Sequence, residues 1–157
     1  MLRTYADKRT PSRRYSVGQV GSVSEVPAVL ESVSPHFLLF LALDASAISD
    51  DVLRVVARAL LDRGLAYLCV WGKDCCRVHD QFDIEREPNE PDGHVVPTTW
   101  HDDEPLEEAL WYFANVAYPD DSFEFDCRDW VAIAVGCSKW EEQIRAELVD
   151  KNTGWPP

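Results

Sequence analysis

Acidic and imidazole side chains follow apolar stretches of this sequence. Asp44 comes directly after Phe37–Leu43, and His101 and Asp102 lie in a polar turn before the aromatic-rich segment 104–118. Hard divalent cations bind clustered carboxylates, and an imidazole can transfer protons near neutral pH. These three side chains are therefore the candidate catalytic residues of a divalent-metal-dependent hydrolase or a nucleotide-binding enzyme. The alternative is structural, because Asp44 suits a turn and Asp102 suits a helix cap.

A tryptophan followed three residues later by an acid occurs twice, as WGKD at residues 71–74 and as WHDD at residues 100–103. Two tryptophans near one edge could sandwich a planar ligand or a partner's side chain. They could equally pack beneath loops. The residues that we predict to bind a ligand or partner are Trp71, Asp74, Thr99, Trp100 and Trp111.

Cys75 and His79 form half of a candidate metal site, which Cys137 and His101 could complete from neighbouring strand ends. Cys75 and His79 are one helical turn apart and would face the same way, but no CxxC or HxxxH pair occurs. Cys75 also begins a predicted helix, where a thiolate nucleophile is favoured. A cysteine–histidine pair on a buried helix face is more often packing. Because neither a GxGxxG motif nor a Walker phosphate loop is present, we predict no cofactor.

The hydrophobic pattern predicts the elements that would position these residues. Apolar strands are expected at Phe37–Leu43, Leu65–Trp71 and Trp130–Val135, with a further strand opening at Val95 and a turn over 98–103. Three of the four strands run directly into a capped helix. This rhythm predicts a three-layer α/β domain of Rossmann-like or flavodoxin-like kind, with a mainly parallel four-strand sheet and helices on both faces. Ligands of such sheets bind at the carboxyl ends of the strands.

Charge divides the chain into two expected parts. Residues 1–14 hold five basic side chains and one acid, although the whole chain has a net charge of −13. We expect residues 1–35 to form a basic extended arm, with a short edge strand near Tyr15–Val20, and residues 36–157 to form a single α/β domain. An acidic body repels nucleic acid and attracts basic proteins, so a basic protein partner is expected and nucleic acid is not.

The segment 104–118 carries more aromatic side chains than one buried helix face needs. Phe113 fits the buried stripe, whereas Trp111, Tyr112 and Tyr118 lie outside it. These side chains predict a surface for a basic partner or for self-association. The alternative is that the N-terminal arm covers them.

No apolar run approaches the roughly 20 residues that cross a bilayer, so no membrane segment is expected. The first residues also lack the pattern of a secretory signal. The five cysteines show no paired spacing, which favours a reducing compartment. We therefore expect a cytoplasmic location.

Two phrases, CVWGKDCCRVHD and TTWHDDEPLEEALWYF, resemble an uncharacterised family of small bacterial α/β proteins. The resemblance covers about Phe37 to Leu148 and leaves the basic arm outside. It implies a bacterial cytosolic domain and supplies no activity. Together with the acidic charge, these observations predict a non-catalytic binding or regulatory protein, of an immunity or antitoxin-like kind, that binds a basic protein. The metal-dependent or nucleotide-binding enzyme is the alternative.

Overall fold

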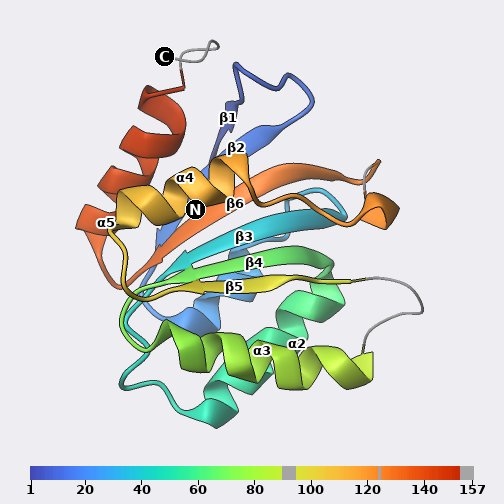
Figure 1. Ribbon diagram of the computed structural model, residues 1–157, viewed down its shortest axis with the longest axis vertical. Helices are drawn as coiled ribbons and strands as arrows, with labels where there is room; N and C mark the ends of the chain where they lie inside the picture. Colours follow the sequence, from blue (N-terminus) through green and yellow to red (C-terminus); the bar gives the residue numbers. More distant parts are fainter. Residues whose placement is uncertain (90–94, 124, 153–157) are drawn as a thin grey trace.

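A single twisted sheet with helices on both faces organises the chain (Figure 1). This computed structural model describes residues 1–89, 95–123 and 125–152. Its strands are β1 (Arg3–Ala6), β2 (Arg14–Val20), β3 (His36–Ala42), β4 (Leu65–Trp71), β5 (Thr98–His101) and β6 (Cys127–Val135). Its helices are η1 (Val23–Glu25), α1 (Val26–Val29), α2 (Asp50–Arg63), α3 (Cys75–Asn89), α4 (Leu106–Asn115), η2 (Asp121–Phe123), α5 (Ser138–Arg145) and η3 (Ala146–Asp150).

The six strands lie in the order β1-β2-β6-β3-β4-β5. Only the β1–β2 pair is antiparallel; β2, β6, β3, β4 and β5 all run in the same direction. The mainly parallel α/β architecture is therefore confirmed, although the sheet has six strands rather than the predicted four. Long apolar runs at the centre of the sheet explain this arrangement, because parallel strands covered on both faces must be hydrophobic throughout.

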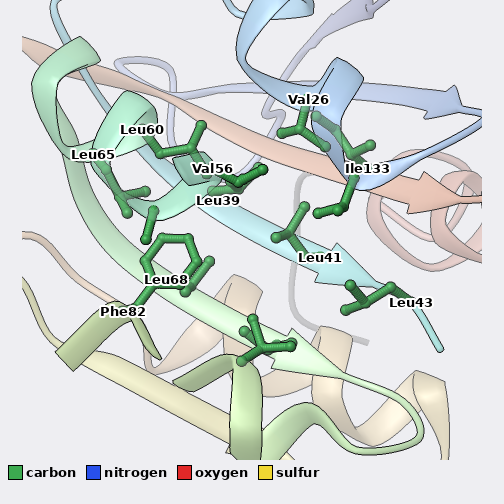
Figure 2. Close-up of a cluster of buried hydrophobic side chains, with 14 of the residues drawn as sticks. Val26, Leu39, Leu41, Leu43, Val56, Leu60, Leu65, Leu68, Phe82 and Ile133 are labelled. Atoms are coloured by element: carbon green, nitrogen blue, oxygen red, sulfur yellow. The ribbon is translucent and has the colours of Figure 1, made fainter. Parts of the chain in front are cut away.

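Alternate side chains of β3 fill two separate cores. Leu39 and Leu41 face the helices α1, α2 and α3, whereas Leu38 and Phe40 face α4 and α5. Figure 2 shows the first of these cores, where strand residues meet Val56 and Leu60 of α2. The period-2 alternation of strand side chains gives each apolar residue a helix to pack against. The sheet is consequently the middle layer of three.

Local sequence signals set the bounds of α2. Ser49 caps its first turn by accepting a hydrogen bond from the Val52 amide at 3.2 Å. Gly64 ends the helix with a φ of +117°, in the left-handed region that glycine adopts without strain. A capped helix directly after a strand is the arrangement that the sequence predicts for this part of the chain.

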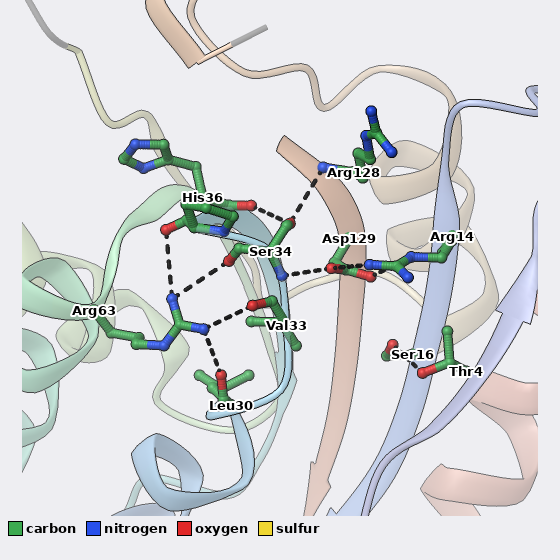
Figure 3. Close-up of polar contacts among 11 residues, drawn as sticks. Thr4, Arg14, Ser16, Leu30, Val33, Ser34, His36, Arg63, Arg128 and Asp129 are labelled. Atoms are coloured by element: carbon green, nitrogen blue, oxygen red, sulfur yellow. Dashed lines mark hydrogen bonds and ion pairs between the residues drawn. The ribbon is translucent and has the colours of Figure 1, made fainter. Parts of the chain in front are cut away.

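The N-terminal segment takes part in the sheet. β2 lies where the edge strand near Tyr15–Val20 was predicted, but β1 pairs with its outer side, so β2 is internal. Asp129 of β6 fastens this region, since its carboxylate accepts hydrogen bonds from Arg14 at 2.9 and 3.1 Å and from the Ser34 amide at 2.7 Å (Figure 3). Residues 1–35 thus supply two strands and two short helices, η1 and α1, to the three-layer body.

Two predicted boundaries were wrong. Thr98–His101, expected as a turn, is the strand β5, because the backbone pairs with β4 even though its side chains are polar. The polar, proline-containing segment 85–93 also predicts a loop, but α3 continues to Asn89; the rest of that segment, 90–93, lies outside the described residues. Within the described ranges, no helix is long and apolar enough to cross a membrane.

Candidate functional site

The carboxyl ends of the parallel strands lie together at one end of the sheet. In the strand register, Val20 pairs with Val135, Ala42 with Ala134, and Trp71 with His101. The loops that leave these strands therefore emerge side by side, as predicted. Between β3 and β6 the connections diverge, because β3 leads to α2 on one face and β6 leads to α5 on the other. Such a switch point is where open α/β sheets bind ligands.

A crevice of about 570 Å³ occupies this switch point. Three segments enclose it: the turn that follows β2, the β3–α2 connection with the first turn of α2, and the β6–α5 connection. Its lining residues are Gly21, Ser22, Val23, Ser24, Asp44, Ala47, Ile48, Ser49, Val52, Val135, Gly136 and Trp140. The volume lies within the range of small-ligand and side-chain pockets.

Asp44 is the charged side chain of this lining. Its carboxylate accepts two hydrogen bonds from Ser46, from the amide at 2.9 Å and from the hydroxyl at 2.6 Å. These bonds, aided by the positive charge of Lys73, lower the pKa of the Asp44 carboxyl. The crevice therefore presents a fixed negative charge at neutral pH.

A second carboxylate closes the turn after β2. Glu25 Oε2 accepts hydrogen bonds from the Gly21 amide at 2.6 Å and the Ser22 amide at 2.9 Å. In nucleotide-binding α/β proteins, free amides of such a turn hold phosphate. Here an acidic side chain already occupies those amides, so a phosphate would meet negative charge. The electrostatics of the crevice favour a cation.

Trp140 supplies an aromatic wall at the α5 side. Its ring meets Trp71 edge to face, with centroids 5.4 Å apart. The Trp71 indole N–H in turn donates to the Glu104 carbonyl at 2.8 Å. Trp71 therefore fixes the position of Trp140 and is not itself part of the crevice lining.

His101 lies in a different environment, beneath α4. Its Nε2 is 3.0 Å from the Thr99 hydroxyl, and its Nδ1 contacts the Glu104 carboxylate. The ring also packs on Tyr112, whose hydroxyl is 2.8 Å from that of Tyr67. His101 is thus held in a buried polar cluster on the α4 face of the sheet.

The three candidate catalytic residues do not share a cavity. Asp44 lines the crevice, His101 is buried beside Glu104, and the Asp102 side chain is exposed. Strand order explains the separation, because β4 lies between β3 and β5. Among the residues with described placement, no group of three or more histidine, cysteine or acidic side chains is positioned to hold a metal ion.

Cys75 and His79 also point to different surroundings. Cys75 is fully buried in the core beneath α3, and burial raises the pKa of its thiol, contrary to the lowered value that a nucleophile needs. His79 is within 3.3 Å of both Asp80 and Asp83 and packs on Trp100 at 4.4 Å between ring centroids. The Cys75 thiol is therefore used in core packing, and the His79 ring contacts Asp80, Asp83 and Trp100.

The remaining predicted binding residues are dispersed. Trp71 and Trp100 occupy opposite faces of the sheet, since Trp100 pairs with Val70 in the register, and so they cannot sandwich one ligand. Asp74 binds Arg77 at 2.9 Å. Trp111 is 63% exposed on the outer side of α4.

A family model of the domain of unknown function DUF7684 matches residues 19–151 of this sequence. The chain belongs to this family. Comparison with curated proteins and with solved structures gave no match.

The DUF7684 match includes every segment that lines the crevice, from Gly21 to Trp140, but not β1 or most of β2. Sequence reasoning identified Asp44 at this site and missed Ser22 and Trp140. The only signals were their positions along the chain, Ser22 two residues after β2 and Trp140 in the first turn of α5 after β6. These positions identify a common site only once β2 is known to lie beside β6.

Proposed function

We propose that this DUF7684 protein is a non-catalytic binding module that receives a basic side chain of a protein partner in the crevice at the β3–β6 switch point. The observation that carries the proposal is the crevice itself, about 570 Å³ in volume, with Asp44 as its charged lining residue. A lysine or arginine side chain could extend along the apolar wall and place its charge beside that carboxylate.

The wall chemistry supports a side chain of this kind. Ile48 and Val52 offer apolar surface for the methylene groups, and Trp140 offers an aromatic face to a guanidinium. The described lining contains no lysine or arginine; the nearby Lys73 acts on Asp44 from outside that lining. The net charge of −13 would steer basic partners toward the protein from a distance.

The same features disfavour the nucleotide-binding alternative. A phosphate at the switch point would face Asp44, and the Gly21 and Ser22 amides already bind Glu25. His101 and Asp102 lie outside the crevice lining and could not assist there.

A titration with two short peptides tests the proposal. The probes are the capped tripeptides acetyl-Gly-Arg-Gly-amide and acetyl-Gly-Gln-Gly-amide, followed by amide and indole resonances in NMR spectra. We expect the arginine peptide to shift the Trp140 indole signal and the Ser22 and Ser49 amides, and to bind more weakly as salt rises. Asp44→Asn should weaken its binding about three- to fivefold, because an exposed ion pair contributes up to ~1 kcal/mol.

Asp51→Asn is the matched control. Asp51 is an exposed carboxylate in the first turn of α2, the helix that follows Asp44 in the chain, but it is not among the lining residues. If both variants lose affinity equally, the attraction is a property of net charge and the crevice is not the site. Equal binding of the arginine and glutamine peptides would also refute the proposal.

A further inference from the structure

A second hollow lies at the opposite end of the strands, where β2 and β6 begin. Its volume is about 350 Å³. The β1–β2 connection contributes Ser12 and Arg13, and the segment after α4 contributes Tyr118. Phe125 comes from the approach to β6, and Arg128 and Trp130 come from the first residues of β6 itself. Since the crevice of the preceding section is at the carboxyl ends of the same strands, the two sites are independent.

The described lining of this hollow holds two arginines and no carboxylate, although the whole protein is acidic. Arg13 is paired with Asp7 at 2.6 Å, and the neighbouring Arg14 is paired with Asp129. Arg128 is exposed, and no carboxylate of the described chain lies within ion-pair distance of it. Figure 3 shows its guanidinium directed away from the Asp129–Arg14 pair. Among the described residues, the Arg128 guanidinium thus has no carboxylate partner, and it lies at the rim of the hollow.

Aromatic side chains form the rest of the wall. The Trp130 ring carries the Arg13 guanidinium over one face, 4.7 Å from the ring centroid, and its centroid is 6.4 Å from that of Tyr118. Phe125 is 86% exposed. Exposed large apolar side chains beside a hollow are typical of binding surfaces, because water contact with them is unfavourable until a ligand covers them.

The indole of Trp130 provides an unused donor. Trp130 is only 4% exposed, and within the described part of the chain its Nε1–H has no acceptor. A buried N–H without a partner costs free energy, and such groups are commonly satisfied by a ligand or a water. This donor belongs to a residue that lines the hollow.

We propose that this hollow binds a small organic anion in which a carboxylate is attached to an aromatic ring. Arg128 pairs with the carboxylate, because guanidinium and carboxylate match in charge and geometry. The ring lies against Tyr118, Phe125 and Trp130. The volume is at the lower end of the range for small-molecule sites, which suits one ring and its acid group.

Phenylacetate is the test probe, with 2-phenylethanol as its uncharged counterpart. Both are titrated into the full-length protein while the tryptophan indole N–H resonances are recorded; the Trp130 signal is assigned by its loss in Trp130→Phe. We expect phenylacetate to shift the Trp130 signal and to bind more tightly than the alcohol. Arg128→Gln should weaken phenylacetate binding by about fivefold or more and leave 2-phenylethanol unaffected.

Arg58→Gln is the control, since it removes an equal charge from an exposed position on α2. Both arginine side chains are solvent-exposed, so the folded state of each variant can be verified by its unchanged amide spectrum. Loss of affinity in both variants, or in neither, would overturn the proposal. So would equal binding of acid and alcohol, or shifts confined to residues outside the hollow. None of these outcomes depends on the arginine-peptide result at the crevice.

Discussion

At the scale of single residues, Asp7 shows how one buried carboxylate can make stability depend on pH. Burial alone would raise the pKa of Asp7, but hydrogen bonds from Asn152, the Arg9 amide and Arg13 outweigh it and lower the pKa from its ordinary value of 3.8. A carboxyl whose pKa is lower in the folded state than in the unfolded state stabilises the protein at pH values above its unfolded-state pKa. This contribution is lost as the pH falls through the folded-state pKa.

We therefore predict that Asp7→Asn lowers the free energy of unfolding by about 3 kcal/mol at neutral pH, since it leaves the largely buried Arg13 without its charged partner. At about pH 3, below the ordinary pKa of 3.8, the difference from wild type should shrink, because the unfolded chain then binds a proton that the folded carboxyl, with its lowered pKa, binds less readily. Urea unfolding at the two pH values measures both quantities. A penalty independent of pH would contradict the assignment, and Asp51→Asn, at an exposed carboxylate, should show neither effect.

At the scale of elements, the turn after β4 requires glycine. Gly72 has a φ of +120°, and a Cβ at this position would lie 1.9 Å from the Leu43 carbonyl oxygen. That carbonyl belongs to the segment leaving β3, so the β3 and β4 exits can approach only because no side chain separates them.

We predict that Gly72→Ala lowers the free energy of unfolding by about 3 kcal/mol, through backbone strain and the clash together. Gly21→Ala is the matched control, because the nearest atom to its Cβ would be the flexible Glu25 carboxylate at 3.3 Å. The control should change stability by less than about 1 kcal/mol. Thermal and urea unfolding measure both variants. If Gly72→Ala and Gly21→Ala lose the same stability, the positive φ and the close Leu43 carbonyl at Gly72 do not decide the outcome.

The central elements could be predicted because they are buried on both faces. Phe37–Leu43 and Leu65–Trp71 are apolar throughout and correspond closely to β3 and β4. β5 was mistaken for a turn because an edge strand covered on part of its surface can carry threonine and histidine. β1 gave no apolar signal, since Arg3–Ala6 is largely exposed.

At the scale of the whole molecule, strand order decides which residues meet. Asp44 was predicted at the site because its position depends on one strand only. The separation of His101 from Asp44 could not be predicted, because the sequence does not reveal that β4 lies between their strands or that β6 inserts between β2 and β3. Contacts among loops follow from long-range pairing that local patterns do not encode.

The two outer strands, β1 and β5, have four residues each, and short edges limit pairing between molecules. We predict that a variant lacking residues 1–6 exposes the longer β2 edge and self-associates more strongly than the full-length chain at equal concentration. Light scattering coupled to size-exclusion chromatography measures the difference. If the shortened chain has the same mass distribution as the full-length protein, β1 is not protecting that edge.

The connection from β2 to β3 must pass across β6 without a strand partner of its own. Arg63 compensates: its guanidinium donates to the carbonyls of Leu30 and Val33 at 2.8 Å and reaches those of Ser34 and Pro35 (Figure 3). One planar cation thus replaces several missing backbone bonds, a geometry that lysine cannot reproduce. Substituting Arg63 would therefore free these carbonyls. We expect the connection between β2 and β3 to become the first part of the backbone that proteases cut, while the sheet stays folded.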